Sequence, residues 1–268
     1  MKPRRSVCKE YGESGTGISN PRAASPKRTR ELGSTRTIVI SVVCVVAIAA
    51  VGSFLYLQPE RSPAAPPKKV VDVAAVKTKA DAGDVQAQKE LGDAYAEGNG
   101  VAQSFTEAAQ WYRLAADHGN AAAAASLGML YDVGQGVKRD ESEAVKWYRK
   151  AAEQGDISGE YNLGLMYGAG RGVPLNAVEA ARWHRLAAEQ GDALAQYNVG
   201  KRYWVGKGVK QDFVEAFKWL TLASRQGIPD ASELLREVKP QLSSADLAEA
   251  NQRINAFTPK KASSASTQ

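Results

Sequence analysis

Residues 84–119 read DVQAQKELGDAYAEGNGVAQSFTEAAQWYRLAADHG, and the same pattern returns three more times in register. The period is 36 residues, and the four copies follow one another without an insertion. Every copy has Leu or Val followed by Gly, then Tyr, two loop glycines and a Trp. The tryptophans are Trp111, Trp147, Trp183 and Trp219. The recurrence indicates one structural unit used four times rather than a single non-repeating core.

Each copy is predicted to form two helices. In the first helix, Ala87, Leu91 and Tyr95 are spaced by four residues and therefore share one face. Gly92 is a poor helix former, and its recurrence predicts that another helix backbone packs closely there. A Gly-x-Gly-Val loop then ends the helix, because glycine readily adopts a positive φ.

The second helix is predicted to begin at a good N-cap, Ser104 in the first copy. Glu107 follows three residues later, and this spacing predicts a capping box. Ala108, Trp111 and Ala115 form the predicted apolar stripe, and a glycine at the C′ position ends the helix. The equivalent caps and glutamates in the later copies are Asp140 and Glu143, Asn176 and Glu179, and Asp212 and Glu215.

The pattern continues in weaker form beyond both ends of the four copies. Residues 71–82 match a second helix, and Ala231 and Leu235 continue the phase of the first helices. Residues 245–257 predict a further helix, capped by Ser243 or Ser244. Such atypical ends shield the terminal apolar faces of a repeat array. The predicted fold is therefore all-α: an α-solenoid of antiparallel helix pairs over residues 70–257, with capping helices, followed by a disordered polar tail over 258–268.

An apolar segment precedes the repeats. Residues 38–57 read IVISVVCVVAIAAVGSFLYL and carry no charge. At ~1.5 Å per residue, such a helix would cross the hydrocarbon core of a bilayer. We predict one transmembrane helix over 37–57, followed by a Pro-rich linker over 58–69. A cleaved signal peptide and a buried core helix are the alternatives; the long leader argues against the first and the prolines that follow argue against the second.

Charge is concentrated at the N-terminus. Residues 1–36 carry nine Lys or Arg and three Asp or Glu, and this surplus equals the whole formal charge of +6. The rest is balanced, so we expect no nucleic-acid partner. The basic segment has too few large apolar residues to fold, and a disordered cytoplasmic tail is expected. The repeats then lie across the membrane, in the periplasm of a bacterium with two membranes. Cys8 and Cys44 both precede the repeats, so the repeats contain no disulfide.

The pattern Ala-x3-Leu-Gly-x2-Tyr-x2-Gly-x-Gly-Val, followed by Glu-Ala-x2-Trp-Tyr-x2-Ala-Ala-x2-Gly, resembles the Sel-1-like repeat family over residues 84–228. These repeats are related to tetratricopeptide repeats. The resemblance implies a right-handed superhelix, a concave surface lined by the first helices, and a role as adaptor or scaffold. Some cysteine-rich members are linked to β-lactam binding or hydrolysis, but the repeats here lack those cysteines.

No catalytic, cofactor-binding or metal-binding set of residues emerges, and we expect no enzyme activity. The chain has two histidines. His184 occupies the phase held by Tyr112 and Tyr148, so it is interpreted as a packing residue. His118 lies in the last turn of a second helix, where a cation suits the helix dipole. We find no metal-ligand spacing, phosphate-binding loop or Gly-x-Ser-x-Gly motif.

Binding is expected at first-helix positions that vary between copies, because the invariant positions maintain the stack. Copies three and four share a Tyr-Asn pair, and aromatic and amide groups suit an extended peptide. The alternative is that the tyrosines only fill the groove between adjacent helices. The predicted binding residues are Tyr161, Asn162, Leu165, Tyr197, Asn198, Lys201 and Trp204.

Together these features predict a single-pass inner-membrane protein with a cytoplasmic N-terminus and a periplasmic repeat domain. We expect it to contact the membrane through residues 38–57, to bind a protein or peptide on the concave face, and to organise an envelope complex. Two alternatives remain: a cell-wall-active or β-lactam-binding or hydrolysing repeat protein, and a signal relay across the inner membrane through the basic tail.

Overall fold

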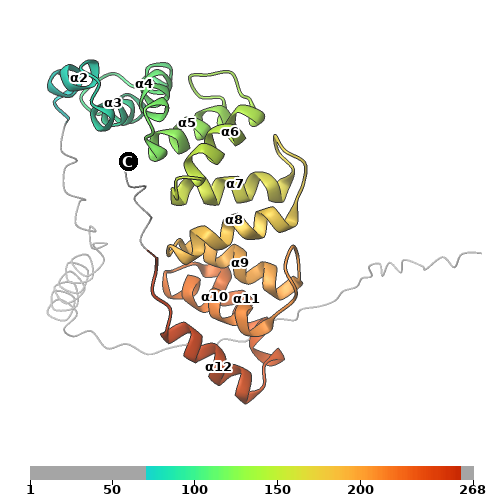
Figure 1. Cartoon of the computed structure of the whole chain (residues 1–268). Coiled ribbons are helices and arrows are strands. Elements are labelled where there is room, and N and C mark those ends of the chain that lie inside the picture. Colours follow the sequence, from blue (N-terminus) through green and yellow to red (C-terminus); the bar gives the residue numbers. More distant parts are fainter. Residues whose placement is uncertain (1–70, 261–268) are drawn as a thin grey trace, which may run out of the picture. The chain divides into compact units, whose positions relative to one another are not determined.

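The computed structural model describes residues 71–260, whose regular structure is entirely helical and forms an α-solenoid (Figure 1). The predicted basic tail (1–36), transmembrane helix (37–57) and linker (58–69), and residues 261–268 of the predicted C-terminal tail, lie outside these residues. Between residues 71 and 260, no helix has both the length and the apolar character needed to cross a bilayer. The helices are α2 (Val73–Asp81), α3 (Val85–Glu97), α4 (Phe105–Asp117), α5 (Ala121–Val133), α6 (Glu141–Ala152), α7 (Ile157–Ala169), α8 (Ala177–Glu189), α9 (Ala193–Val205), α10 (Phe213–Arg225), α11 (Pro229–Val238), a 3₁₀ turn η1 (Lys239–Gln241) and α12 (Ser244–Asn255).

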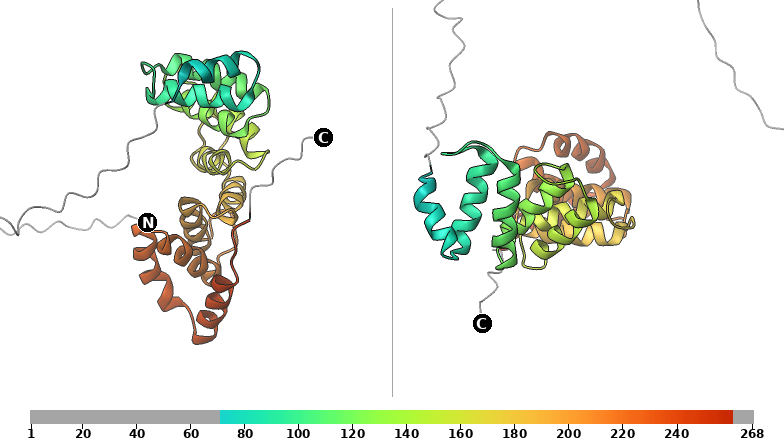
Figure 2. Two further views of the ribbon diagram at one scale, coloured as in Figure 1. Left: turned by 90° about the vertical axis from the view of Figure 1, so that its left-hand side faces the viewer. Right: turned by 90° about the horizontal axis from the view of Figure 1, so that it is seen from above.

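The helices form the predicted pairs, α3 with α4, α5 with α6, α7 with α8 and α9 with α10, and each pair packs on the next (Figure 2). Local signals explain the bounds of the first helices. The Asp84 carboxylate, for example, accepts a hydrogen bond of 2.9 Å from the Ala87 N–H at the start of α3. Gly98 ends that helix in the left-handed region with φ of 71°. The same roles fall to Asn120 and Gly134, Asp156 and Gly170, and Asp192 and Gly206.

The N-caps of the second helices are confirmed, but the capping box is wrong. The Ser104 hydroxyl accepts the N–H of Glu107, as predicted. The Ser104 N–H, which a capping box would give to the Glu107 side chain, instead donates to the Tyr95 carbonyl at 2.9 Å. The loop folds back so that this carbonyl competes successfully with the glutamate. Asp140, Asn176 and Asp212 donate in the same way to Tyr131, Tyr167 and Tyr203, and the reciprocal box forms only in α12, between Ser243 and Asp246, among the helices that the structure describes.

A side chain rather than a helix backbone occupies the space beside Gly92. A Cβ at this position would lie 2.5 Å from Cδ1 of Tyr112, in the second helix of the same repeat. The glycine is therefore needed to admit the ring. Equivalent pairs are Gly128 with Tyr148, Gly164 with His184, and Gly200 with Leu220. At Gly200 the backbone nitrogen of Leu220 also lies close, 3.1 Å from the position of a Cβ.

Close backbone approach occurs at the second loop glycine instead. Gly136, with φ of 69°, lies so near the backbone of Phe105 and Thr106 that a Cβ would overlap it. The loop of one repeat thus packs on the first turn of the preceding second helix. Gly172 and Gly208 repeat this contact against Glu141 and Ala177.

The buried stripe of the second helix differs from the prediction at one position, where Tyr112 takes the place predicted for Trp111. Ala108 and Ala115 are fully buried, but Tyr112 is buried more deeply than Trp111, which lies at the edge. Tyr112 faces α3, whereas the tryptophan position faces the neighbouring pair. Trp183 and Trp219 are nevertheless buried in the later copies.

The C-terminal end folds back on the solenoid. Helix α12 packs on α10, and the ring of Phe257 meets Trp219 edge-on at 5.5 Å. The Lys260 N–H donates to the Glu189 carbonyl at 2.9 Å, and the Lys260 Nζ lies 2.6 Å from the Glu189 carboxylate. Residues 257–260, which we call the C-terminal strap, therefore connect the last helix to repeat three.

Candidate functional site

A shallow groove of about 330 Å³ crosses the first helices α3, α5 and α7. Apolar contacts come from Ala122, Ala125 and Met129, whose side chain is 50% exposed. The helical period brings these elements together because each first helix presents the same face. The polar lining residues are Lys89, Ser126, Asp156, Ser158 and Asn162. We call this surface the first-helix groove.

Of the seven predicted binding residues, Asn162 lines the first-helix groove. Leu165 is 36% exposed, and it occupies in repeat three the position that Met129 occupies in repeat two. Met129 could have been identified from the sequence if the comparison of Leu165 with Lys201 had included the equivalent position of repeat two.

Tyr161 and Asn198 are engaged with the solenoid itself. The Tyr161 ring lies 5.6 Å from the His184 ring, and burial, the largest influence, raises the pKa of its hydroxyl. That hydroxyl also hydrogen-bonds the side chain of Asn198 in the next first helix. This contact agrees with the alternative interpretation that Tyr161 fills the space between neighbouring helices.

Tyr197, Lys201 and Trp204 lie on α9 and do not line the first-helix groove. Tyr197 and Trp204 are half-buried against the core formed by α10 and α11. The Nζ of Lys201 lies 5.9 Å from the Tyr197 ring centroid. Of the predicted residues, Asn162 thus lines the first-helix groove, and the α9 residues hold the equivalent phases one repeat further along.

Both histidines are held in structural contacts. His184 is 1% exposed against Gly164, and burial followed by the charge of Arg202 lowers its pKa to about 3. It is therefore neutral at physiological pH. His118 caps α4 and has its Nδ1 3.1 Å from the Gln88 side-chain oxygen. These contacts match the packing interpretation of His184 and place His118 at the helix end.

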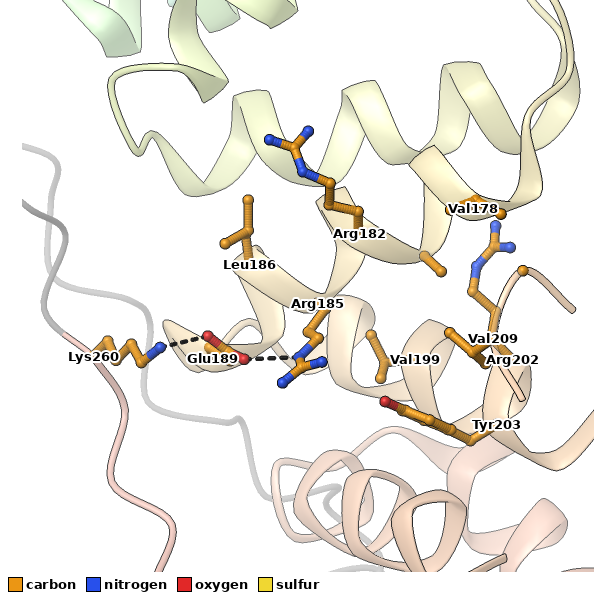
Figure 3. A pocket seen from close by; sticks show the side chains of 12 residues that line it. Val178, Arg182, Arg185, Leu186, Glu189, Val199, Arg202, Tyr203, Val209 and Lys260 are labelled. Atoms are coloured by element: carbon orange, nitrogen blue, oxygen red, sulfur yellow. Dashed lines mark hydrogen bonds and ion pairs between the residues drawn. The ribbon is translucent and has the colours of Figure 1, made fainter. Parts of the chain in front are cut away.

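A second cavity, of about 490 Å³, lies between α8 and α9, beside the C-terminal strap (Figure 3). Its apolar wall includes Val178, Leu186 and Val199, and Arg185 and Arg202 line it as well. The sequence analysis did not identify this cavity. Within the part of the chain that the structure describes, no three His, Cys, Asp or Glu residues are grouped to hold a metal ion.

Stacked antiparallel helix pairs with a constant 36-residue period define a helical-repeat solenoid. The Sel1 repeat model matches residues 85–120, 121–156, 157–192 and 193–228, which together make up more than half of the chain. The protein belongs to the Sel1 repeat family. Members of this family are generally protein-interaction scaffolds and are typically non-enzymatic.

Two solved structures are similar in sequence and fold. One is a protective antigen present in uropathogenic Escherichia coli strains, displaying an SLR fold; it is 41% identical, with a TM-score of 0.58, over 60% of this chain and 34% of its own. The chain thus spans about a third of that antigen. The other, a Sel1 repeat protein from Oxalobacter formigenes, is 32% identical, with a TM-score of 0.59, over 68% of this chain and 77% of its own. No curated protein matches the chain.

Proposed function

We propose that this protein is a membrane-anchored scaffold whose Sel1 repeats bind a protein or peptide in the first-helix groove and organise an envelope complex. The observation that carries the proposal is the groove itself, which crosses three successive first helices and exposes Met129. Apart from Asp156, which is one of the recurring N-caps, its lining residues vary between repeats, whereas the residues that hold the stack recur. Family membership supports a scaffold role.

The groove suits an extended peptide. Met129 and the neighbouring alanines offer an adaptable apolar contact for one side chain. The Asn162 amide both donates and accepts, so it matches a peptide backbone. The Lys89 ammonium is paired with Asp93 at 2.6 Å, which holds it at the edge of the groove.

The membrane location rests on the sequence. Residues 38–57 are uncharged, and the basic excess lies on their N-terminal side, which supports an N-terminus in the cytoplasm and repeats in the periplasm. Alkaline extraction of membranes and protease treatment of spheroplasts test this. A chain released by alkali, or repeats that protease reaches only after lysis of the spheroplasts, would contradict the placement.

The groove is tested with the full chain, by cross-linking in cells and identification of the captured proteins. Met129→Glu combined with Asn162→Ala should remove the specific partner, because a charge then replaces the apolar contact. Leu114→Glu is the matched control, since Leu114 is an exposed apolar residue on the second helix α4. An identical set of captured proteins for both variants and the wild type would exclude the first-helix groove as the binding surface.

A further inference from the structure

Arg202 occupies a position that the other repeats reserve for the apolar core. The equivalent residues of the preceding first helices are Ala94, Leu130 and Met166, and all three are buried. Arg202 is half-buried at the junction of α9 with α8. Repeat four therefore lacks the apolar core contact made at this position in the other repeats and has a guanidinium group there instead.

The partners of Arg202 are neutral and distant. Its side chain donates to the carbonyls of Ala177 and Lys207 and to Nδ1 of His184, each at 3.4 Å. His184 is uncharged because its pKa is lowered to about 3. No ion pair within residues 71–260 includes Arg202. A partly buried cation without a counter-ion is costly, and a bound anion would offset that cost.

The cavity beside Arg202 has an excess of positive charge. Arg182, Arg185 and Lys260 also line it, against one lining carboxylate, that of Glu189. Arg182 is paired with Glu179, outside the lining, at 3.2 Å. Arg185 and Lys260 hold the Glu189 carboxylate at 2.9 and 2.6 Å, on the side of the cavity next to the strap (Figure 3). The Glu189 carboxylate is thus already paired with two cations. No carboxylate that lines the cavity compensates the charge of Arg202.

The remaining wall is apolar. Val178, Leu186, Val199 and Val209 line the cavity together with the Tyr203 ring. Its volume of about 490 Å³ is within the range of small-ligand sites, ~300–1,000 Å³. An ion alone would leave this wall uncovered, so the site matches an anion that carries an apolar group.

We propose that the cavity between α8 and α9 binds a carboxylate carried by an apolar group, with Arg202 as its counter-ion. Such a carboxylate is found at the end of a peptide with an apolar last residue and in a free acyl acid. The chain's own residues 261–268, KASSASTQ, contain no large apolar side chain and do not match the wall. This site does not rest on the first-helix groove, which is built from other helices.

The test uses the full chain in a non-ionic detergent and a fluorescent peptide ending in Leu-Leu, with either a free carboxylate or an amide. Fluorescence anisotropy should show that the acid binds at least about tenfold more tightly than the amide, since a charge-assisted hydrogen-bonded pair is worth about that factor. Competition by octanoate distinguishes the two sources of the carboxylate, a peptide end and a free acyl acid. If octanoate displaces the peptide, the site also accepts free acids; if it does not, the site recognises a peptide end. Either result supports the carboxylate site.

Arg202→Met is the decisive variant because Met166 fills the same position in repeat three. It should fold at least as stably as the wild type, as judged by thermal unfolding, and should lose the preference for the acid. Arg202→Lys should keep part of that preference. Equal binding of acid and amide, no binding of either, or an unchanged preference in Arg202→Met would overturn the proposal. So would binding that appears only after removal of residues 261–268, since these residues would then be the occupant.

Discussion

The carboxylate of Glu160 in α7 accepts a hydrogen bond of 2.8 Å from the side-chain amide of Gln190 at the end of α8. The next repeat has the same pair with an amide in place of the acid, Gln196 with Gln226 at 2.9 Å. Glu160 is 4% exposed, and burial is the main cause that raises its pKa to about 7; the Gln190 hydrogen bond acts in the opposite direction.

Glu160 should make the stability of repeat three depend on pH. Its pKa is about 7 in the folded chain and about 4.5 when unfolded. The folded state therefore holds the proton more tightly, and the free energy of unfolding falls as pH rises from about 4.5 to about 7. We expect Glu160→Gln to be more stable than the wild type by about 2–3 kcal/mol near pH 8 and to differ little near pH 4, by urea unfolding. Gln196→Glu, the converse variant, should introduce the same dependence; a slope that persists in Glu160→Gln would contradict this assignment.

Gly92→Ala should destabilise the first repeat although alanine favours a helix by ~1 kcal/mol. The added methyl would meet the Tyr112 ring at 2.5 Å, and overpacking of this kind costs about 1–3 kcal/mol. Chemical unfolding should show a net loss of up to about 2 kcal/mol, because the helix propensity of alanine offsets about 1 kcal/mol of the overpacking cost. In a Tyr112→Ala background the same change should be neutral or stabilising. Equal losses in both backgrounds would mean that the ring is not the obstacle.

The two residues of the predicted capping box, Asp140 and Glu143, should differ in their effects. Asp140→Ala should cost about 1 kcal/mol, because its side chain accepts the N–H groups of Ser142 and Glu143. Glu143→Ala should cost less than about 0.5 kcal/mol, because the Asp140 N–H already donates to Tyr131. Thermal unfolding of the two variants compares them directly, and similar losses would favour a reciprocal box after all.

Removing the ring of the C-terminal strap should loosen repeats three and four. Phe257→Ala loses the edge-on contact with Trp219, and we expect a loss of about 1–3 kcal/mol. Lys260→Ala is the control, since it removes an exposed ion pair but keeps the backbone hydrogen bond to Glu189. Hydrogen exchange near residues 185–191 should increase in the first variant and change little in the second. Unchanged exchange in Phe257→Ala would show that the strap does not stabilise this region.

The helices of the solenoid were predictable from the sequence because their signals are local. Asp84 and Gly98 act within one turn of the helix they start or end, and the 36-residue period repeats these signals four times. The partner of Gly92 was not predictable in this way, since Tyr112 reaches it only after the intervening loop has folded. The capping box failed for the same reason: the Tyr95 carbonyl is close in space rather than at the motif spacing.

The candidate site was predictable only in part. Asn162 was identified because variable first-helix positions face the groove, whereas Met129 lay one copy outside the set that was compared. Arg202 departs visibly from the phase of Leu130 and Met166, but its cavity also needs Lys260, which is distant in sequence. Periodicity locates positions on a helix; it does not show which distant segments pack beside them.

The bond between Lys260 and Glu189 joins residues 71 positions apart in a protein whose other helices contact mainly their neighbours along the chain. It closes a loop of 71 positions around the last repeat pair, whereas at the other end of the described residues the hydrogen bond from the Val71 N–H to the Asn99 side-chain oxygen spans 28 positions. If the two ends of residues 71–260 are pulled apart, α2 and α3 should therefore peel away first, and the loop should open only at higher force. Under an extending force, the solenoid is therefore expected to unfold first at the α2–α3 end and later at the end held by the C-terminal strap.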